Sequence, residues 1–192
     1  MKRWFSQVNR GLVLLLVVIL GVAVYIVLAT LKTNKQRSVL RELAIQYTSD
    51  SAILYTFPQD VDYHDRSAMT RDALLPVLYK KAEPVYHYFC NNTAVQNAQV
   101  DATYNYLYIS CMSEQVPVSC TRTVTSVEID EVYRGSATVL VYSSTVIEYQ
   151  DMEGKRSTHE SQVQDTLLFV YQDGEWKIAN VNCDLIQMYD HY

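Results

Sequence analysis

Residues 167–181 have the sequence Leu-Leu-Phe-Val-Tyr-Gln-Asp-Gly-Glu-Trp-Lys-Ile-Ala-Asn-Val. An apolar and aromatic run stands on each side of the dipeptide Asp173-Gly174, which is a strong signal for a tight hairpin turn. The pattern predicts two antiparallel strands, over residues 162–171 and 175–184. The C-terminal part of the chain is therefore expected to end in a β-hairpin.

The strand pattern extends from this hairpin towards the N-terminus. Residues 137–149 form a long β-branched run, and residues 150–156 predict a turn in which Gly154 can adopt a positive φ. Residues 118–132 also alternate, but the phase of the alternation changes near Ser126, which predicts a β-bulge there. These segments together predict a strongly bent antiparallel sheet.

Residues 100–106, Val-Asp-Ala-Thr-Tyr-Asn-Tyr, are apolar or aromatic at even positions and polar at odd positions. This alternation is typical of a strand with one buried face. We therefore expect a further strand here, before the bent sheet.

Helices are expected ahead of the strands. Residues 35–55 carry apolar side chains at helical spacing, which predicts an amphipathic helix. Ser67 or Thr70 is suited to cap a second helix, which Pro76 should kink or restart and Pro84 should end. The expected fold class is α+β, with an N-terminal transmembrane helix followed by two or three helices packed on a curved, mostly antiparallel sheet.

Residues 11–31 form a run of 21 residues without a charged side chain, between Arg10 and Lys32. A hydrocarbon core of about 30 Å needs roughly 20 such residues in a helix. A cleaved signal peptide is an alternative, but its apolar region spans only about 7 to 15 residues. A buried core helix is the other alternative, but a helix that is apolar on every face needs protein all round it. We expect a retained membrane anchor.

The anchor divides the chain into a basic cytoplasmic tail (1–10), a transmembrane helix (11–31), a juxtamembrane amphipathic helix (32–55) and an extracytoplasmic domain (56–192). Basic residues flank both ends of the span, so the positive-inside rule alone does not fix the orientation. A cytoplasmic N-terminus is favoured because a long C-terminal domain crosses the membrane largely regardless of its charge. The expected location is the cell membrane, with a single pass and the domain outside.

Residues 42–192 are strongly acidic, with nine Lys or Arg against 21 Asp or Glu, a net charge of −12. An acidic surface repels the phosphate backbone, and the sequence has no basic stripe with interleaved aromatic residues. Nucleic-acid binding is therefore not expected. The bilayer and a protein partner in a membrane complex are the expected partners, and a small ligand is an open alternative.

The four cysteines, Cys90, Cys111, Cys120 and Cys183, all lie in the expected exterior domain. Two disulfides are one interpretation, with Cys111–Cys120 closing a turn between two strands and Cys90–Cys183 as the remaining pair. Four buried free thiols are the equally weighted alternative. No Cys-x-x-Cys spacing or nearby Cys/His pairing suggests zinc, so no metal is expected.

Catalytic candidates are few. Asp62, His64 and Asp65 form an acidic loop in which a histidine among carboxylates can act as a general base or help to bind a cation, although a solvated loop has the same composition. His87 lies between two tyrosines and can line a pocket or pack in the core. No nucleophile elbow, phosphate loop, metalloprotease helix or paired-glycine fingerprint is present, so no cofactor is expected.

The closing hairpin over residues 167–181, placed after helices and further strands, resembles that of the nuclear transport factor 2-like superfamily. This superfamily includes ketosteroid isomerase and SnoaL-type cyclases. The resemblance implies a curved sheet wrapped around a cavity, used by some members for catalysis and by others for binding or assembly. Catalytic members place an Asp base or an Asp/His dyad with a Tyr donor inside the cone, and these roles do not align to particular positions here.

The resemblance also extends to membrane-anchored members, which include inner-membrane assembly factors of type IV secretion and conjugation systems. The expected function is a non-enzymatic binding or assembly module of a cell-envelope complex. The alternatives are a ketosteroid-isomerase-like or hydrolytic enzyme with an Asp/His/Tyr pocket, and a spacer with neither pocket nor partner.

Overall fold

The computed structural model describes residues 10–65 and 69–184 of the 192-residue chain. Contacts divide the chain into two compact units, Met1–Val39 and Leu40–Tyr192. The α-helix α1 (Arg10–Asp50) begins in the first unit and ends in the second, where the 3-10 helix η1 (Ser51–Tyr55) follows it. The apolar run and the amphipathic segment therefore belong to one helix.

The first unit contributes the apolar part of α1. By length and composition, the helical stretch from Val13 to Tyr55 includes a window able to cross a membrane, with a mean hydropathy of 3.0 and no part of that window buried. Leu14 and Tyr25, for example, are 68% and 73% exposed. Such a row of exposed apolar side chains is costly in water, which favours a membrane environment for this unit.

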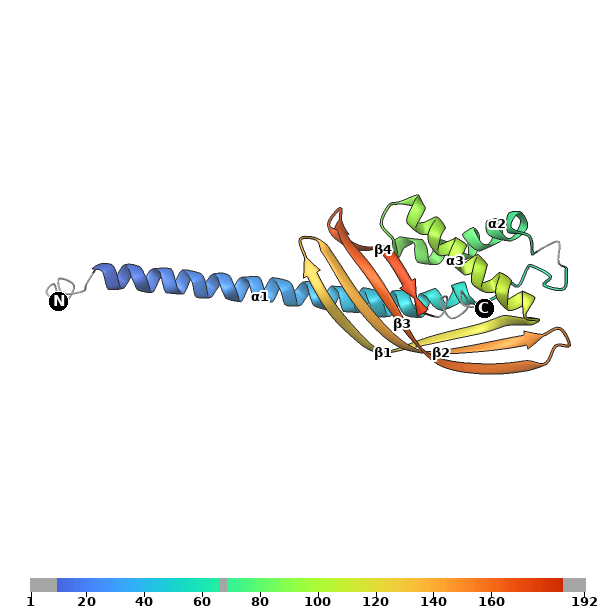
Figure 1. The fold of residues 1–192 in the computed structure, drawn as a ribbon. Coiled ribbons are helices and arrows are strands. Elements are labelled where there is room, and N and C mark those ends of the chain that lie inside the picture. The colour runs from blue at the N-terminus through green and yellow to red at the C-terminus, as the bar shows by residue number, and fades with distance from the viewer. Residues whose placement is uncertain (1–9, 66–68, 185–192) are drawn as a thin grey trace. The chain divides into compact units, whose positions relative to one another are not determined.

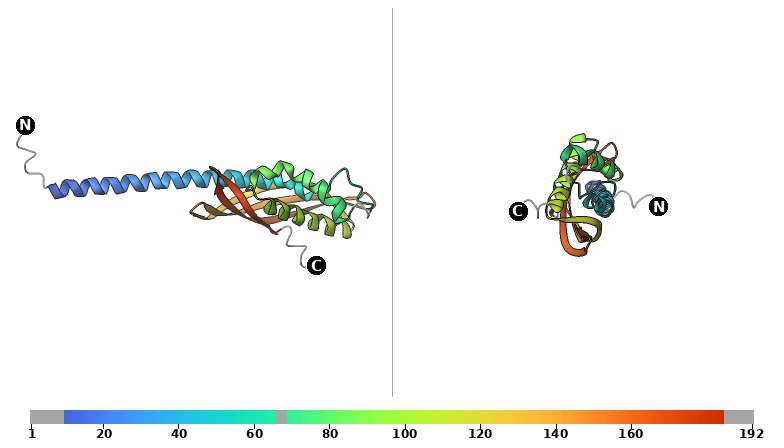
Figure 2. Two further views of the ribbon diagram at one scale, coloured as in Figure 1. Left: turned by 90° about the horizontal axis from the view of Figure 1, so that it is seen from above. Right: turned by 90° about the vertical axis from the view of Figure 1, so that its right-hand side faces the viewer.

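The second unit has the predicted α+β architecture (Figure 1). Its helices are the end of α1, α2 (Arg71–Ala82) and α3 (Thr93–Met112), with a 3-10 helix, η2 (Glu83–Tyr88), between α2 and α3. α2 runs through Pro76 and has ended before Pro84, where the sequence predicted a break. The second view of Figure 2 shows the sheet curling beside α2 and α3.

Four antiparallel strands form the sheet in the order β1-β2-β3-β4. Their bounds are Gln115–Tyr133 for β1, Ser136–Asp151 for β2, Arg156–Gln172 for β3 and Glu175–Cys183 for β4. The predicted bulge is confirmed, because the β1–β2 register shifts between Val124 and Ser126, and two more shifts occur along the same pair. Bulges bend a strand and increase its twist, which explains why so long a sheet is curved.

The turns and the core follow the sequence pattern closely. Asp173 and Gly174 both have positive φ angles, as the predicted hairpin requires, and so does Gly154. Every odd residue of β2 from Ala137 to Tyr149 is buried, so this strand presents one complete face to the core. Leu40, Ala44 and Tyr47 of α1 are buried in the same core.

The predicted strand over residues 100–106 is wrong, because these residues lie in the middle of α3. Val100, Thr103, Tyr106 and Leu107 are buried at spacings of three and four, which is a helical face. The Asn92 side chain accepts a hydrogen bond from the backbone N–H of Ala94 at 3.0 Å and caps the helix. Alternation over seven residues also fits helical spacing, and the Asn92 cap is the local signal that distinguishes the helix.

Candidate binding site

A buried ion pair occupies the concave side of the sheet. Arg122 of β1 contacts Asp165 of β3 with 2.5 Å between Nη2 and Oδ2, and the two side chains are 1% and 0% exposed. The guanidinium also donates to the hydroxyl groups of Ser51 (3.1 Å) and Ser143 (3.2 Å). The pair thus joins η1 to three neighbouring strands.

Aromatic side chains close the space around this pair. Tyr47, Tyr55, Tyr106 and Phe169 are among the largest fully buried side chains of the described chain. The guanidinium carbon of Arg122 lies 5.4 Å from the centre of the Tyr55 ring, within the range of a cation–π contact. The chain's own aromatic side chains therefore bury this pair from solvent.

The electrostatics keep this interior in fixed protonation states. Burial raises the pKa of the Tyr47 and Tyr55 hydroxyl groups, and the charge of Asp165 adds to the effect for both. Burial disfavours the charge of Arg122, but Tyr55 and Asp165 favour it more, so the pKa of the guanidinium is raised overall. The buried Asp165 carboxylate is paired with a permanent cation through Oδ2, so this oxygen is already engaged within the chain.

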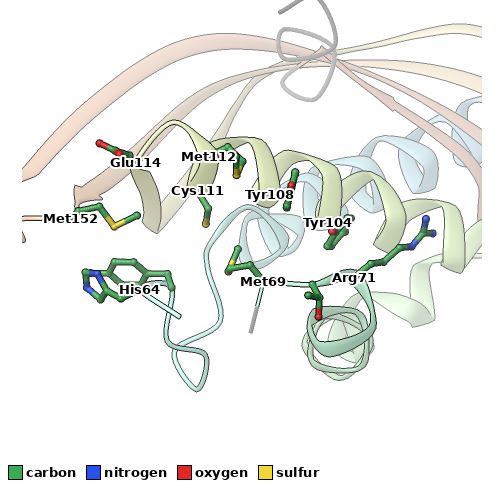
Figure 3. Close-up of a pocket in the computed structure, with 11 residues that line it drawn as sticks. His64, Met69, Arg71, Tyr104, Tyr108, Cys111, Met112, Glu114 and Met152 are labelled. Carbon is green, nitrogen blue, oxygen red and sulfur yellow. The ribbon is translucent and has the colours of Figure 1, made fainter. Parts of the chain in front are cut away.

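An open groove of about 690 Å³ lies elsewhere in the second unit (Figure 3). α3 forms one wall with Tyr104, Tyr108, Cys111 and Met112, and Glu114 follows at its end. The segment before α2, the first residue of α2 and the turn after β2 complete the groove with Tyr63, His64, Met69, Thr70, Arg71 and Met152. Its size is that of a typical ligand site.

The wall on α3 is a stripe of tyrosine and sulfur side chains that is half-buried at Tyr104 and Cys111 and exposed at Tyr108 and Met112. Tyr104, Tyr108, Cys111 and Met112 are spaced by four, three and one residues, so they share one side of the helix. Tyr108 is 40% and Met112 is 61% exposed, and the rings of Tyr104 and Tyr108 stack with centroids 5.8 Å apart. Exposed Tyr and Met side chains are characteristic of surfaces that bind partners.

The structure places only one of the catalytic candidates in this groove. His64 lines it and packs on Tyr63 with ring centroids 4.3 Å apart, and its backbone N–H donates to Asp62 Oδ1 at 2.9 Å. Asp65 follows in the same loop and donates its backbone N–H to the Asp62 carbonyl. His87 belongs to η2, where its Nδ1 lies 2.8 Å from the Pro84 carbonyl oxygen, and it does not line the groove.

All four cysteines are free thiols in the structure. Cys111 ends a helix and Cys120 lies in β1, so the turn between two strands that motivated this pairing is a helix-to-strand connection. The Cys90 N–H donates to the Ile178 carbonyl, and Cys183 lies five residues further along β4, about 16 Å away for an extended strand. This spacing is too long for a Cys90–Cys183 bridge.

Sequence reasoning missed Arg122 and Asp165, although their positions carried a signal. Asp165 shares the inward phase of Val163 and Leu167 on β3, so a charge was placed among core residues. Arg122 likewise has the phase of Val124 on β1, a side chain packed against the core. An inward charge on each of two strands predicts a buried pair, because an unpaired buried charge is very costly.

No family model matches the sequence, and no curated protein matches it. The described domain packs helices on a curved four-stranded antiparallel sheet, in the order helices then meander. The α+β class expected from the sequence, with helices followed by a curved antiparallel sheet, is thereby confirmed.

Three solved structures are similar to the chain at low sequence identity. A nuclear transport factor 2-like protein from Novosphingobium aromaticivorans is 14% identical, with a TM-score of 0.44 over 82% of this chain and 86% of that one. CagV from Helicobacter pylori, a VirB8 homolog of a type IV secretion system, is 9% identical, with a TM-score of 0.45 over 74% and 96%. A putative dehydratase from Streptomyces avermitilis is 11% identical, with a TM-score of 0.38 over 64% and 94%. Function has to be argued from the site.

Proposed function

We propose that this chain is a single-pass, membrane-anchored binding module of a cell-envelope assembly, with its N-terminus in the cytoplasm and its folded domain outside. In this proposal it is not an enzyme, and a protein partner binds the groove along α3. The observation that carries the proposal is the contrast between a buried ion pair around Arg122 and an open groove lined by exposed Tyr and Met.

The anchor is supported by the exposed apolar side chains of α1. Four cations, Lys32, Lys35, Arg37 and Arg41, follow the uncharged run before the first acid, Glu42. On the outer surface these cations would lie near anionic headgroups, each worth about 1 kcal/mol. The anchor would thus hold the domain close to the bilayer, where a membrane complex assembles.

The enzymatic alternative has one observation in its favour, since Asp165 is buried with Tyr47 and Tyr55 nearby, as in a ketosteroid-isomerase-like pocket. Against it, the Arg122 guanidinium occupies one carboxylate oxygen of Asp165 at 2.5 Å. Chemistry there would require substrate to displace both the cation and the surrounding aromatic rings. The binding module is therefore the better supported function.

The test uses the full chain, expressed in its membrane and cross-linked before extraction in detergent. The double variant Tyr108→Ala with Met112→Ala should lose a stoichiometric cross-linked partner that the unmodified chain retains. Tyr133→Ala is the matched control, because Tyr133 is an exposed tyrosine (54%) on β1, outside the groove. Equal recovery of the partner with the groove variant and the control would refute the proposed surface.

The location is tested separately by protease added to intact cells. Cleavage of the domain in intact cells supports the extracytoplasmic orientation. Protection in intact cells combined with cleavage after lysis would place the domain in the cytoplasm.

A further inference from the structure

Sulfur is concentrated in the groove. The described chain contains three methionines, Met69, Met112 and Met152, and all of them line this one groove together with Cys111. They come from three different parts of the chain, namely the segment before α2, the end of α3 and the turn after β2. Thioether and thiol groups therefore converge here without any repeat in the sequence.

Three of these groups face the same part of the groove. Figure 3 shows the Cys111 sulfur pointing from α3 into the groove, with Met69 rising towards it from the opposite wall and Met112 beside it. Met69 is 7% exposed and Met112 is 61% exposed, so the cluster runs from the floor of the groove to its rim. Met152 and His64 lie at the other end, near the β2–β3 turn.

The donor set selects one class of metal ion. No group of three His, Cys, Asp or Glu side chains within residues 10–65 and 69–184 is arranged to hold a metal, so a site for zinc or a harder ion has no basis here. Thioether and thiolate sulfurs instead favour soft ions, of which Cu(I) is the biological example. The flexible methionine side chain adapts readily to a small ion.

We propose that Met69, Cys111 and Met112 form a binding site for a single Cu(I) ion in this groove. On binding, the Cys111 thiol loses its proton to solvent and its sulfur bonds to the ion, while the two thioethers donate lone pairs without any change in charge. No electron is transferred. The inference goes beyond the proposed function and does not depend on the anchor or on the partner.

The experiment titrates the full chain in detergent, without oxygen, with Cu(I) held by a coloured competing chelator. We expect one ion per chain, and the single variants Met69→Leu, Met112→Leu and Cys111→Ser should each lose at least about tenfold in affinity. Leucine conserves volume and apolar character, so the groove should keep its shape. The readout is the affinity of the purified chain for the ion, measured without a partner, so failure of this inference is distinguishable from failure of the proposed function.

Two matched controls decide the result. Met152→Leu removes a thioether at the far end of the groove, and Cys120→Ser removes a half-buried thiol outside it, so both should keep the affinity of the unmodified chain within about threefold. Folding of each variant is checked by circular dichroism. Absence of Cu(I) binding, equal affinity in the ligand variants and the controls, or Zn(II) binding as tight as Cu(I) would each overturn the proposal.

Discussion

Two Arg–Asp pairs with similar geometry stand in opposite surroundings. The Arg122–Asp165 pair lies inside the domain with side-chain exposures of 1% and 0%, whereas the Arg71–Asp101 pair lies beside the groove with exposures of 59% and 41%. Their N···O distances, 2.5 Å and 2.7 Å, are nearly the same. The difference in solvent, not the contact distance, determines what each pair does.

The interior pair has no water to replace a missing partner, so both charges have to be present together. The rim pair can exchange its partner for water at little cost. The first pair therefore fixes the interior in one arrangement, while the second leaves Arg71 free to face a ligand in the groove. The buried ion pair therefore stabilises the interior of the domain, whereas the exposed pair leaves the groove surface able to rearrange.

The largest expected effect comes from breaking the interior pair. Asp165→Ala leaves Arg122 buried without a counter-charge and should lower the free energy of unfolding by about 3–5 kcal/mol. The measurement is denaturant unfolding of the full chain in detergent, followed by tryptophan fluorescence, to which the buried Trp176 contributes.

The control replaces both members, as Arg122→Met with Asp165→Leu, and should be close to the unmodified chain in stability. A double variant as unstable as Asp165→Ala would indicate that the pair contributes through its hydrogen bonds to Ser51 and Ser143. In that case the two Arg–Asp pairs would differ in hydrogen bonding rather than in solvation.

Lys81 provides a cation between these two extremes. Its ammonium group donates to the Thr56 carbonyl and to Thr56 Oγ1, the latter at 2.8 Å, and burial lowers its pKa from 10.5 to about 8. Below pH 8 the folded and unfolded chains both hold the proton. Between pH 8 and 10.5 only the unfolded chain holds it, so this group makes stability rise with pH, by at most about 3 kcal/mol in total.

The measurement compares the unmodified chain with Lys81→Met between pH 7.5 and 9. The free energy of unfolding of the unmodified chain should rise relative to the variant over this range. Cys120, which faces Lys81, has its pKa raised to about 11 by burial and acts with the opposite sign only above its ordinary value of 9. If the difference in the free energy of unfolding between the unmodified chain and Lys81→Met did not change up to pH 9, Lys81 would be as accessible to solvent as Arg71.

The same contrast explains which features the sequence could predict. The sheet, the Asp173-Gly174 turn and the bulge near Ser126 follow from local rules of period and turn chemistry, and the structure has all three. The misassigned segment is residues 100–106, because alternation over seven residues also fits the helical spacing of Val100, Thr103 and Tyr106. Without this helix, the sequence gives no reason to place Tyr104, Tyr108, Cys111 and Met112 on one surface.

The candidate site was harder to predict because its residues are far apart in the sequence. His64 was identified, but Met69, Cys111 and Met152 come together only through tertiary packing, and none stands in a motif. The interior pair was accessible in principle, since Arg122 and Asp165 both have the inward phase of their strands. Local sequence patterns predict individual helices and strands. A site formed by residues from several helices and strands can be identified only when the tertiary structure is known.

The smallest expected effect comes from the rim pair. Asp101→Ala removes the partner of Arg71, but both side chains are largely in solvent, so the free energy of unfolding should change by about 0.5 kcal/mol or less. The change should shrink further when salt is raised from about 0.1 M to 1 M, because the Debye length falls from about 10 Å to 3 Å. Denaturant unfolding at the two salt concentrations measures both quantities. A loss comparable with that of Asp165→Ala, or one independent of salt, would mean that the groove is closed by contacts as strong as those of the interior, and the contrast between the two pairs would fail.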